Sequence, residues 1–245
     1  MPRFKLTVEY DGRGLVGWQR QSNGPSVQES LETAIHRFCQ EAAAVHGAGR
    51  TDAGVHALGQ VAHVDLACTP TPHTVRNAIN FHLKPAAIAV LTAEAVDQAF
   101  HARFSALGRA YRYRILNRPA PPVLDRGRVW WVPRDLDVEA MNEAAAVLTG
   151  RHDFSSFRAA ICQASSPVRT LDRLTVRRRE NDIVVEAEAR SFLHHQVRNM
   201  VGALKWVGEG RWTAADLAAA LAARDRRRGG PTAPAEGLYL VHVTY

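Results

Sequence analysis

The sequence of 245 residues has few cysteines, only three lysines and no long apolar run. The cysteines, Cys39, Cys68 and Cys162, lie far apart and lack the paired spacings of zinc sites or disulfide frameworks, which predicts ordinary buried or half-buried thiols. No apolar stretch approaches the roughly 20 residues that span a bilayer. The opening five residues lack the apolar core of a signal peptide. We therefore expect a cytoplasmic protein without a membrane partner.

Sequence motifs that bind metals or nucleotides are absent as well. The 11 histidines include no His-Glu-x-x-His pattern. His194 and His195 are adjacent, and on a helix such neighbours point about 100° apart. The glycine-rich segment 47–59 matches neither Gly-x-Gly-x-x-Gly nor the Walker lysine pattern. We expect neither a metal nor an organic cofactor.

Positive charge is present but unevenly placed. Of the 31 Lys+Arg and 24 Asp+Glu, residues 1–108 hold nine of each, so the whole net charge of +7 lies in residues 109–245. This asymmetry indicates a polyanionic partner, because basic side chains that contact phosphates release counterions. Arginine is the better bidentate phosphate ligand, although a genome that favours arginine codons explains the scarcity of lysine equally well.

Helices and strands are mixed along the chain. Residues 4–10 alternate apolar and polar, which is typical of a half-buried strand, and Ser26 with Glu29 predicts a capping box at the start of a helix. Helices are predicted near residues 26–38, 72–83, 138–148, 193–207 and 214–223, and strands near residues 4–10, 61–66, 88–96, 109–116, 129–132, 171–178, 183–189 and 238–245. A short apolar segment lies near residues 44–46. Strands in hairpin-like succession favour an α+β fold with mainly antiparallel sheets over a doubly wound parallel sheet.

The most informative segment surrounds a single carboxylate. It reads Gly47-Ala48-Gly49-Arg50-Thr51-Asp52-Ala53-Gly54-Val55-His56-Ala57. Flanking glycines let the backbone fold tightly and present Asp52 into a cleft. The alternative is a polar surface turn in which Asp52 caps a helix or forms an Asx-turn.

This segment resembles the catalytic motif of the TruA family of tRNA pseudouridine synthases, and the likeness extends over nearly the whole chain. The other blocks that carry it are Tyr10-Asp11-Gly12, Gly17-Trp18-Gln19-Arg20-Gln21, His101-Ala102-Arg103-Phe104-Ser105-Ala106, Tyr111-Arg112-Tyr113, Phe154-Ser155-Ser156-Phe157-Arg158, Phe192-Leu193-His194-His195-Gln196-Val197-Arg198-Asn199-Met200-Val201-Gly202 and Ala235-Glu236-Gly237-Leu238-Tyr239-Leu240. The resemblance implies the pseudouridine synthase fold, in which two α+β subdomains surround a central basic cleft. We place the subdomains at residues 1–106, with the Asp52 loop, and at residues 107–245.

The resemblance also implies an activity. Members isomerise uridine to pseudouridine at nucleotides 38, 39 and 40 of the tRNA anticodon stem-loop, and act as homodimers on tRNA rather than DNA. The reaction detaches uracil from C1′ and rejoins it through C5 without net redox change. A carboxylate suffices, whether it adds to the base, traps the ribose cation or removes the 2′ proton.

Particular residues take roles from the same resemblance. Asp52 is the essential carboxylate, and Arg198 is the guanidinium that pairs with it, where the residues alone suggest a solvated helix position. Tyr111 stacks on the target base, where strand periodicity alone fits core packing beside Tyr113. Arg50 fills the space of the flipped nucleotide, unless it only positions Asp52. Thr51, beside it, is a further substrate-binding residue.

The remaining arginines are generic phosphate ligands in this interpretation. The ones we single out as substrate-binding are Arg112 and Arg158, with Arg114 and residues 226–228 as further candidates, although a solvated face or a disordered loop explains them too. Two other functions stay open at this stage. One is a non-catalytic RNA-binding module, and the other is a pseudouridine synthase with a different RNA target.

Overall fold

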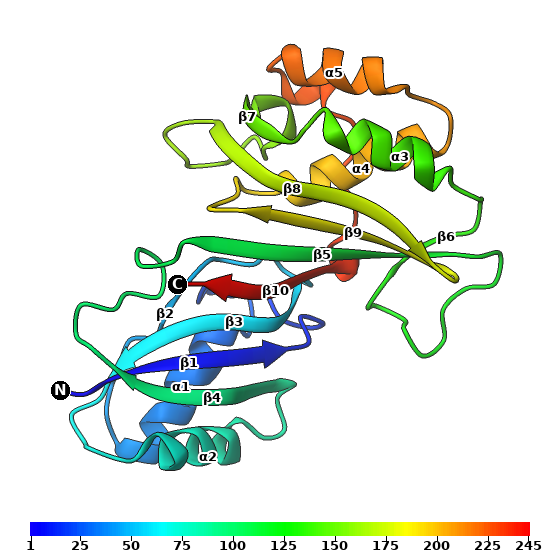
Figure 1. The fold of residues 1–245 in the computed structure, drawn as a ribbon. Helices are drawn as coiled ribbons and strands as arrows, with labels where there is room; N and C mark the ends of the chain where they lie inside the picture. Colours follow the sequence, from blue (N-terminus) through cyan, green and yellow to red (C-terminus); the bar gives the residue numbers. More distant parts are fainter. The chain divides into compact units, whose positions relative to one another are not determined.

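The computed structural model describes residues 1–245, which divide into two compact units (Figure 1). The first unit comprises Met1–Leu107 and Tyr239–Tyr245, and the second comprises Gly108–Leu238. Sequence reasoning placed the last strand in the second half. It lies in the first unit because it pairs with a strand there, a contact between distant segments that no local pattern records. No helix is both long and apolar enough to span a membrane.

The first unit is a mainly antiparallel sheet with two long helices. Its elements are β1 (Arg3–Tyr10), α1 (Val27–Cys39), β2 (His46–Gly47), β3 (His56–Asp65), α2 (Pro72–Leu83), β4 (Ile88–Val96) and β10 (Leu238–Thr244). The strand order is β4-β1-β3-β10, with β2 paired to β3. β1 runs antiparallel to both neighbours, whereas β10 is parallel to β3. Figure 1 shows α1 behind these strands, and it packs against α2.

The central strand β1 confirms the period-two prediction. Phe4, Leu6, Val8 and Tyr10 are buried, and the residues between them are half-buried or exposed. One β-bulge interrupts its pairing with β3, where Val8 is opposite Gln60 but Tyr10 is opposite Ala57. The extra residue lies on β3, close to the start of that strand, and bulges of this kind redirect the chain next to functional loops.

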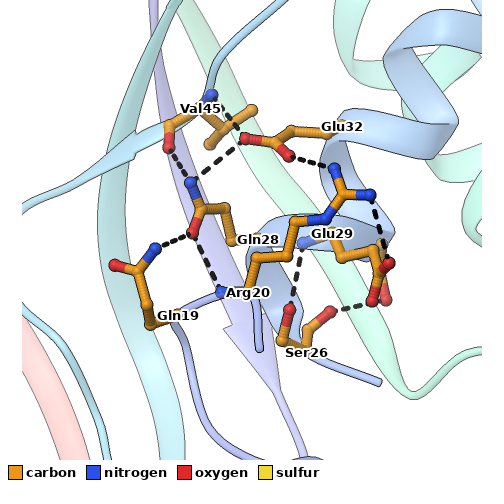
Figure 2. A network of polar contacts seen from close by, with 8 residues as sticks. Gln19, Arg20, Ser26, Gln28, Glu29, Glu32 and Val45 are labelled. Carbon is orange, nitrogen blue, oxygen red and sulfur yellow. Dashed lines mark hydrogen bonds and ion pairs between the residues drawn. The ribbon is translucent and has the colours of Figure 1, made fainter. Parts of the chain in front are cut away.

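Helix α1 begins at the predicted cap. The Ser26 hydroxyl accepts the Glu29 N–H at 3.2 Å, but the Glu29 carboxylate pairs with Arg20 at 3.5 Å. Figure 2 shows Arg20 spanning from Glu29 to Glu32, while Gln28 hydrogen-bonds to the backbone carbonyl of Val45. The helix therefore holds the segment before it and the segment after it at one end of the unit.

The second unit is also a mainly antiparallel sheet covered by helices. Its elements are β5 (Gly108–Asn117), β6 (Trp130–Val132), α3 (Val138–Ala146), β7 (Gly150–Asp153), η1 (Ser155–Phe157), β8 (Val168–Arg179), β9 (Asp182–Ala189), α4 (Gln196–Gly208), α5 (Ala214–Ala222), η2 (Arg226–Arg228) and η3 (Ala235–Gly237). The order is β5-β9-β8-β7, all antiparallel, with β6 parallel to β5. α3 packs on β8 and against α4 and α5 (Figure 1). The α+β prediction is confirmed.

Most predicted elements are present, and the differences have physical causes. β3 begins at His56 rather than near Val61, because pairing with β1 continues past the bulge. α4 begins at Gln196 rather than at Leu193, because His195 has φ +62 and the Gln196 side chain accepts the Leu193 N–H. β7 was not predicted, since its four residues are ordered by pairing with β8.

Candidate active site

The loop that carries Asp52 is held by hydrogen bonds on both sides of the carboxylate. Before it, the Ala48 N–H donates to the Val61 carbonyl at 2.7 Å, and the Gln60 side chain donates to the Gly49 carbonyl at 2.8 Å. Beyond it, the Val55 N–H donates to the Asp52 carbonyl at 3.1 Å and closes a turn. Gly54 supplies the positive φ, +77, that such a turn favours at its third residue. The backbone is thus fixed from β2 to β3.

The opening block of the sequence forms the support beneath this loop. A Cβ atom at Gly12 would lie 2.2 Å from the Val55 carbonyl oxygen, and one at Gly17 would lie 2.5 Å from the Thr51 carbonyl oxygen. Gly17 also has φ +107, a conformation that other residues rarely adopt. The Trp18 N–H donates to the Thr51 carbonyl at 3.1 Å. Two segments about 40 residues apart therefore meet backbone against backbone, which only glycine permits.

Thr51 fixes the residue next to the carboxylate. Its hydroxyl lies 2.8 Å from the Tyr10 hydroxyl, and Thr51 is 6% exposed. Burial raises the pKa of Tyr10 to about 12, so the phenol stays protonated at neutral pH. Sequence reasoning assigned Thr51 to substrate binding, and its burial favours a role as the anchor of the loop.

His56 is a further anchor that sequence reasoning missed. Its Nδ1 accepts the Gly12 N–H at 3.0 Å, and its ring stacks on Tyr239 with the centroids 4.7 Å apart. His56 therefore joins the opening block, the Asp52 loop and β10. The available signal was its place in the glycine-rich segment, two residues after Gly54, but the sequence does not distinguish a buried histidine from an exposed one.

The exposed fractions of the loop residues distinguish their possible roles. Asp52 is half-buried and Arg50 is exposed, while Thr51 between them is buried. The Asp52 and Arg50 side chains therefore reach solvent, while the backbone that carries them is held in place. A half-buried carboxylate on a rigid loop can act as a nucleophile or a base, and an exposed guanidinium beside it can contact a polyanion. The alternative of a simple surface turn explains neither the buried Thr51 nor the close glycine contacts.

In the second unit, Tyr111 and Tyr113 lie on the same face of β5 but differ in burial. Tyr113 is 0% exposed, and its hydroxyl donates to the Pro234 carbonyl at 2.7 Å. Tyr111 is half-buried, and its ring meets Phe192 edge to face at 5.2 Å between centroids. Core packing therefore accounts for Tyr113, whereas Tyr111 retains an accessible part of its ring.

Arg198 lies in the first turn of α4 and is half-buried. Its Nε donates to the Ala233 carbonyl at 2.8 Å, and the Ala233 N–H donates back to the Arg198 carbonyl at 3.0 Å. This reciprocal pair holds the arginine to the segment before η3. The alternative of a fully solvated arginine does not fit these contacts.

The other candidate arginines differ in their contacts with acidic side chains and in their burial. Arg114 pairs with Asp182 at 2.7 Å and with Asp125 at 3.3 Å, and Arg112 approaches Glu186 at 3.6 Å. Arg158 is half-buried directly after η1.

Residues 226–228 form η2, so the alternative of a disordered loop is wrong. Arg226 points inward, since its guanidinium donates to the Gly230 carbonyl at 2.7 Å and to the Asn199 side chain at 3.1 Å. Arg227 and Arg228 are exposed.

Comparison with known proteins identifies the family of this chain. The sequence matches the family described as tRNA pseudouridine synthase over residues 6–105 and 144–245. It is 64% identical to tRNA pseudouridine synthase A of Rhodospirillum centenum, over the full length of both chains. It is 63% identical to the protein of the same name from Rhodospirillum rubrum, over the whole of this chain and 88% of the relative. The chain therefore belongs to the tRNA pseudouridine synthase family, and the predictions of that family and of an isomerase are confirmed.

The close backbone approach at Gly12 yields a stability test. Gly12→Ala places a Cβ against the Val55 carbonyl, and we expect a melting temperature roughly 2–12 °C lower, from about 1–3 kcal/mol of overpacking. Gly49→Ala is the matched control, because its Cβ meets nothing within 4 Å. Thermal melts of both variants provide the measurement. Equal melting temperatures would contradict the proposed support beneath the Asp52 loop.

Proposed function

We propose that this chain converts uridine to pseudouridine at nucleotides 38, 39 and 40 of the tRNA anticodon stem-loop, with Asp52 as the essential carboxylate. The single observation that carries the proposal is a half-buried carboxylate on a glycine-framed loop that is anchored at Thr51, Gly49 and Val55. Family membership supports the reaction class, and the resemblance of the sequence blocks supports the tRNA positions.

The chemistry explains why one carboxylate is sufficient. The reaction breaks the bond between C1′ and N1, forms a bond between C1′ and C5, and moves the C5 proton to N1 through solvent or a side chain. Atoms and electrons balance without a redox partner or a transferred group. Asp52 can add to the base, trap the ribose cation or remove the 2′ proton, and each step uses an ionised carboxylate on a fixed backbone.

Access to the base requires that the nucleotide leave its stem. Flipping costs a few kcal/mol, because stacking and pairing are lost. Arg50 is exposed two residues before Asp52, so it is positioned to compensate through contacts with the strand or the vacated space. We assign this role to Arg50.

Tyr111 and Arg198 complete the proposed machinery. The half-buried ring of Tyr111, braced by Phe192, offers a flat surface on which a base can stack. Arg198 is held at its Nε by Ala233, and the family resemblance gives it the role of pairing with the Asp52 carboxylate. Arg112 and Arg158 are proposed as contacts to tRNA.

The wider setting is part of the same proposal. A tRNA substrate implies action in the cytoplasm, and a homodimer would present two such sites to tRNA. Light scattering of the purified chain would measure its oligomeric state. Tritium release from C5-labelled uridine in tRNA separates catalysis from a purely RNA-binding role. Mapping pseudouridines in RNA from a deletion strain separates the anticodon stem-loop from another target.

The first test of the proposal is Asp52→Asn. We expect turnover to fall by at least about 10³-fold, because the amide cannot act as nucleophile or base, while tRNA affinity changes by no more than a few-fold. Glu9→Gln, an exposed carboxylate on β1, is the control for loss of one charge. Tritium release and filter binding measure the two quantities. Turnover above about one-tenth of wild type in Asp52→Asn would end the assignment.

Tyr111→Phe separates stacking from proton transfer. If the hydroxyl takes part in removing the C5 proton, turnover drops while tRNA binding is kept, because the ring remains. Tyr113→Phe is the matched control, since loss of its bond to the Pro234 carbonyl should lower stability by about 1 kcal/mol and leave turnover intact. Normal turnover in Tyr111→Phe, with Tyr111→Ala inactive, would reduce Tyr111 to a stacking surface.

Salt dependence tests where phosphates bind. Arg227→Gln with Arg228→Gln should lower the log–log salt slope of tRNA affinity by up to about 1.8, at about 0.9 for each duplex phosphate contact. Melting should change little, because both side chains are exposed. Arg226→Gln should instead lower the melting temperature, because its contacts with Gly230 and Asn199 are internal. An unchanged slope in the double variant would make both arginines a solvated face.

A further inference from the structure

Three potential metal ligands meet at the end of the first unit. Cys39 is the last residue of α1, Glu41 follows two residues later, and Cys68 lies three residues beyond β3. The two sulfur atoms and a carboxylate oxygen all lie within 4.8 Å of one another. All three residues are half-buried. Spacing along the sequence could not reveal this set, because the cysteines are 29 positions apart.

The local backbone brings these side chains together. Gln40 has φ +58, and its N–H donates to the His36 carbonyl at 2.8 Å, which ends the helix and turns the chain back. The Glu41 carboxylate then accepts the Ala67 N–H at 2.7 Å and the Cys68 N–H at 2.9 Å, one on each oxygen. Each oxygen keeps a second lone pair. The carboxylate is thus oriented in the way that ligating carboxylates usually are.

The chemistry of the three side chains determines which cation fits them. Two thiolates and a carboxylate suit a borderline or soft divalent cation, above all Zn²⁺, and do not suit Mg²⁺ or Ca²⁺. At Zn–S distances of about 2.3 Å, ligands at tetrahedral corners lie about 3.8 Å apart. The observed limit of 4.8 Å needs a closure of about 1 Å or less, which is within rotamer adjustment. Three protein ligands leave one corner for water.

A disulfide between Cys39 and Cys68 is the rival interpretation, and Glu41 argues against it. A disulfide would not involve the Glu41 carboxylate. A cation uses all three groups.

We propose that Cys39, Glu41 and Cys68 bind one divalent cation of the Zn²⁺ class, which fastens the end of α1 to the connection between β3 and α2. The site is remote from the chemistry. The Asp52 loop enters β3 at His56 and Cys68 follows its other end, so the ten-residue strand separates them by about 30 Å. The site is therefore structural, and it does not depend on the proposed function.

The test uses the full chain, reduced and freed of metal by a chelator. Titration with Cd²⁺ should give a thiolate-to-metal charge-transfer band that saturates at one equivalent, and Zn²⁺ added to a separate metal-free sample should raise the melting temperature. Cys39→Ser and Cys68→Ser should each weaken Cd²⁺ binding by at least about tenfold, and Glu41→Gln should also weaken it. Cys162→Ser is the matched control, because Cys162 is half-buried in the other unit.

A measurement on the unaltered chain guards against variants that fail to fold. Zn²⁺ should protect Cys39 and Cys68 from alkylation and leave Cys162 reactive, as peptide mass spectrometry would record. The proposal is overturned if no charge-transfer band forms, if Cys39→Ser retains it, or if Zn²⁺ protects neither or only one of the two cysteines.

Discussion

The contact on which the first unit depends is the backbone approach between the opening block and the Asp52 loop. Gly12 and Gly17 lie so close to the carbonyl oxygens of Val55 and Thr51 that a Cβ atom at either position would overlap them. This contact turns a glycine-rich segment, which would be mobile alone, into a rigid support for one carboxylate. Catalysis by a fixed carboxylate needs that rigidity, because an error of about 1 Å in position costs orders of magnitude in rate.

Buried polar groups also hold the Asp52 loop in place. The Tyr10 hydroxyl meets Thr51, and the His56 ring meets both Gly12 and Tyr239. The Tyr10 hydroxyl and the His56 Nδ1 each have a polar partner on a different segment, so displacing either side chain leaves a buried polar group unpaired, at about 1–3 kcal/mol. The loop therefore moves only with its neighbours. The proposed cation site would strengthen the opposite end of the same unit, where the Glu41 carboxylate holds the end of α1 to the connection after β3.

The arginines of the second unit differ in whether they contact other residues of that unit or solvent. Its surplus arginines were all equivalent phosphate candidates by sequence, but the fold uses some of them for itself. Arg114 pairs with two aspartates, and Arg226 hydrogen-bonds to Asn199 inside its own unit. Arg227 and Arg228 are exposed, and although Arg227 pairs with Asp225 at 2.7 Å, a pair this exposed contributes little stability, so both side chains can contact phosphate at little cost to the fold. The arginines that stabilise this unit are therefore largely distinct from those proposed to contact tRNA.

The sequence by itself determined the elements whose cause is local. Alternation defines β1, the Ser26 cap begins α1, and α2 spans the predicted residues 72–83. The ordered motifs also determined the family and Asp52 as the candidate carboxylate, because the glycines that flank Asp52 lie close to it in the sequence. Tertiary structure alone decided that β10 joins the first unit, that Thr51 and His56 are anchors, and that Cys39 and Cys68 meet. These outcomes rest on contacts between residues tens to hundreds of positions apart, and no local periodicity encodes such contacts.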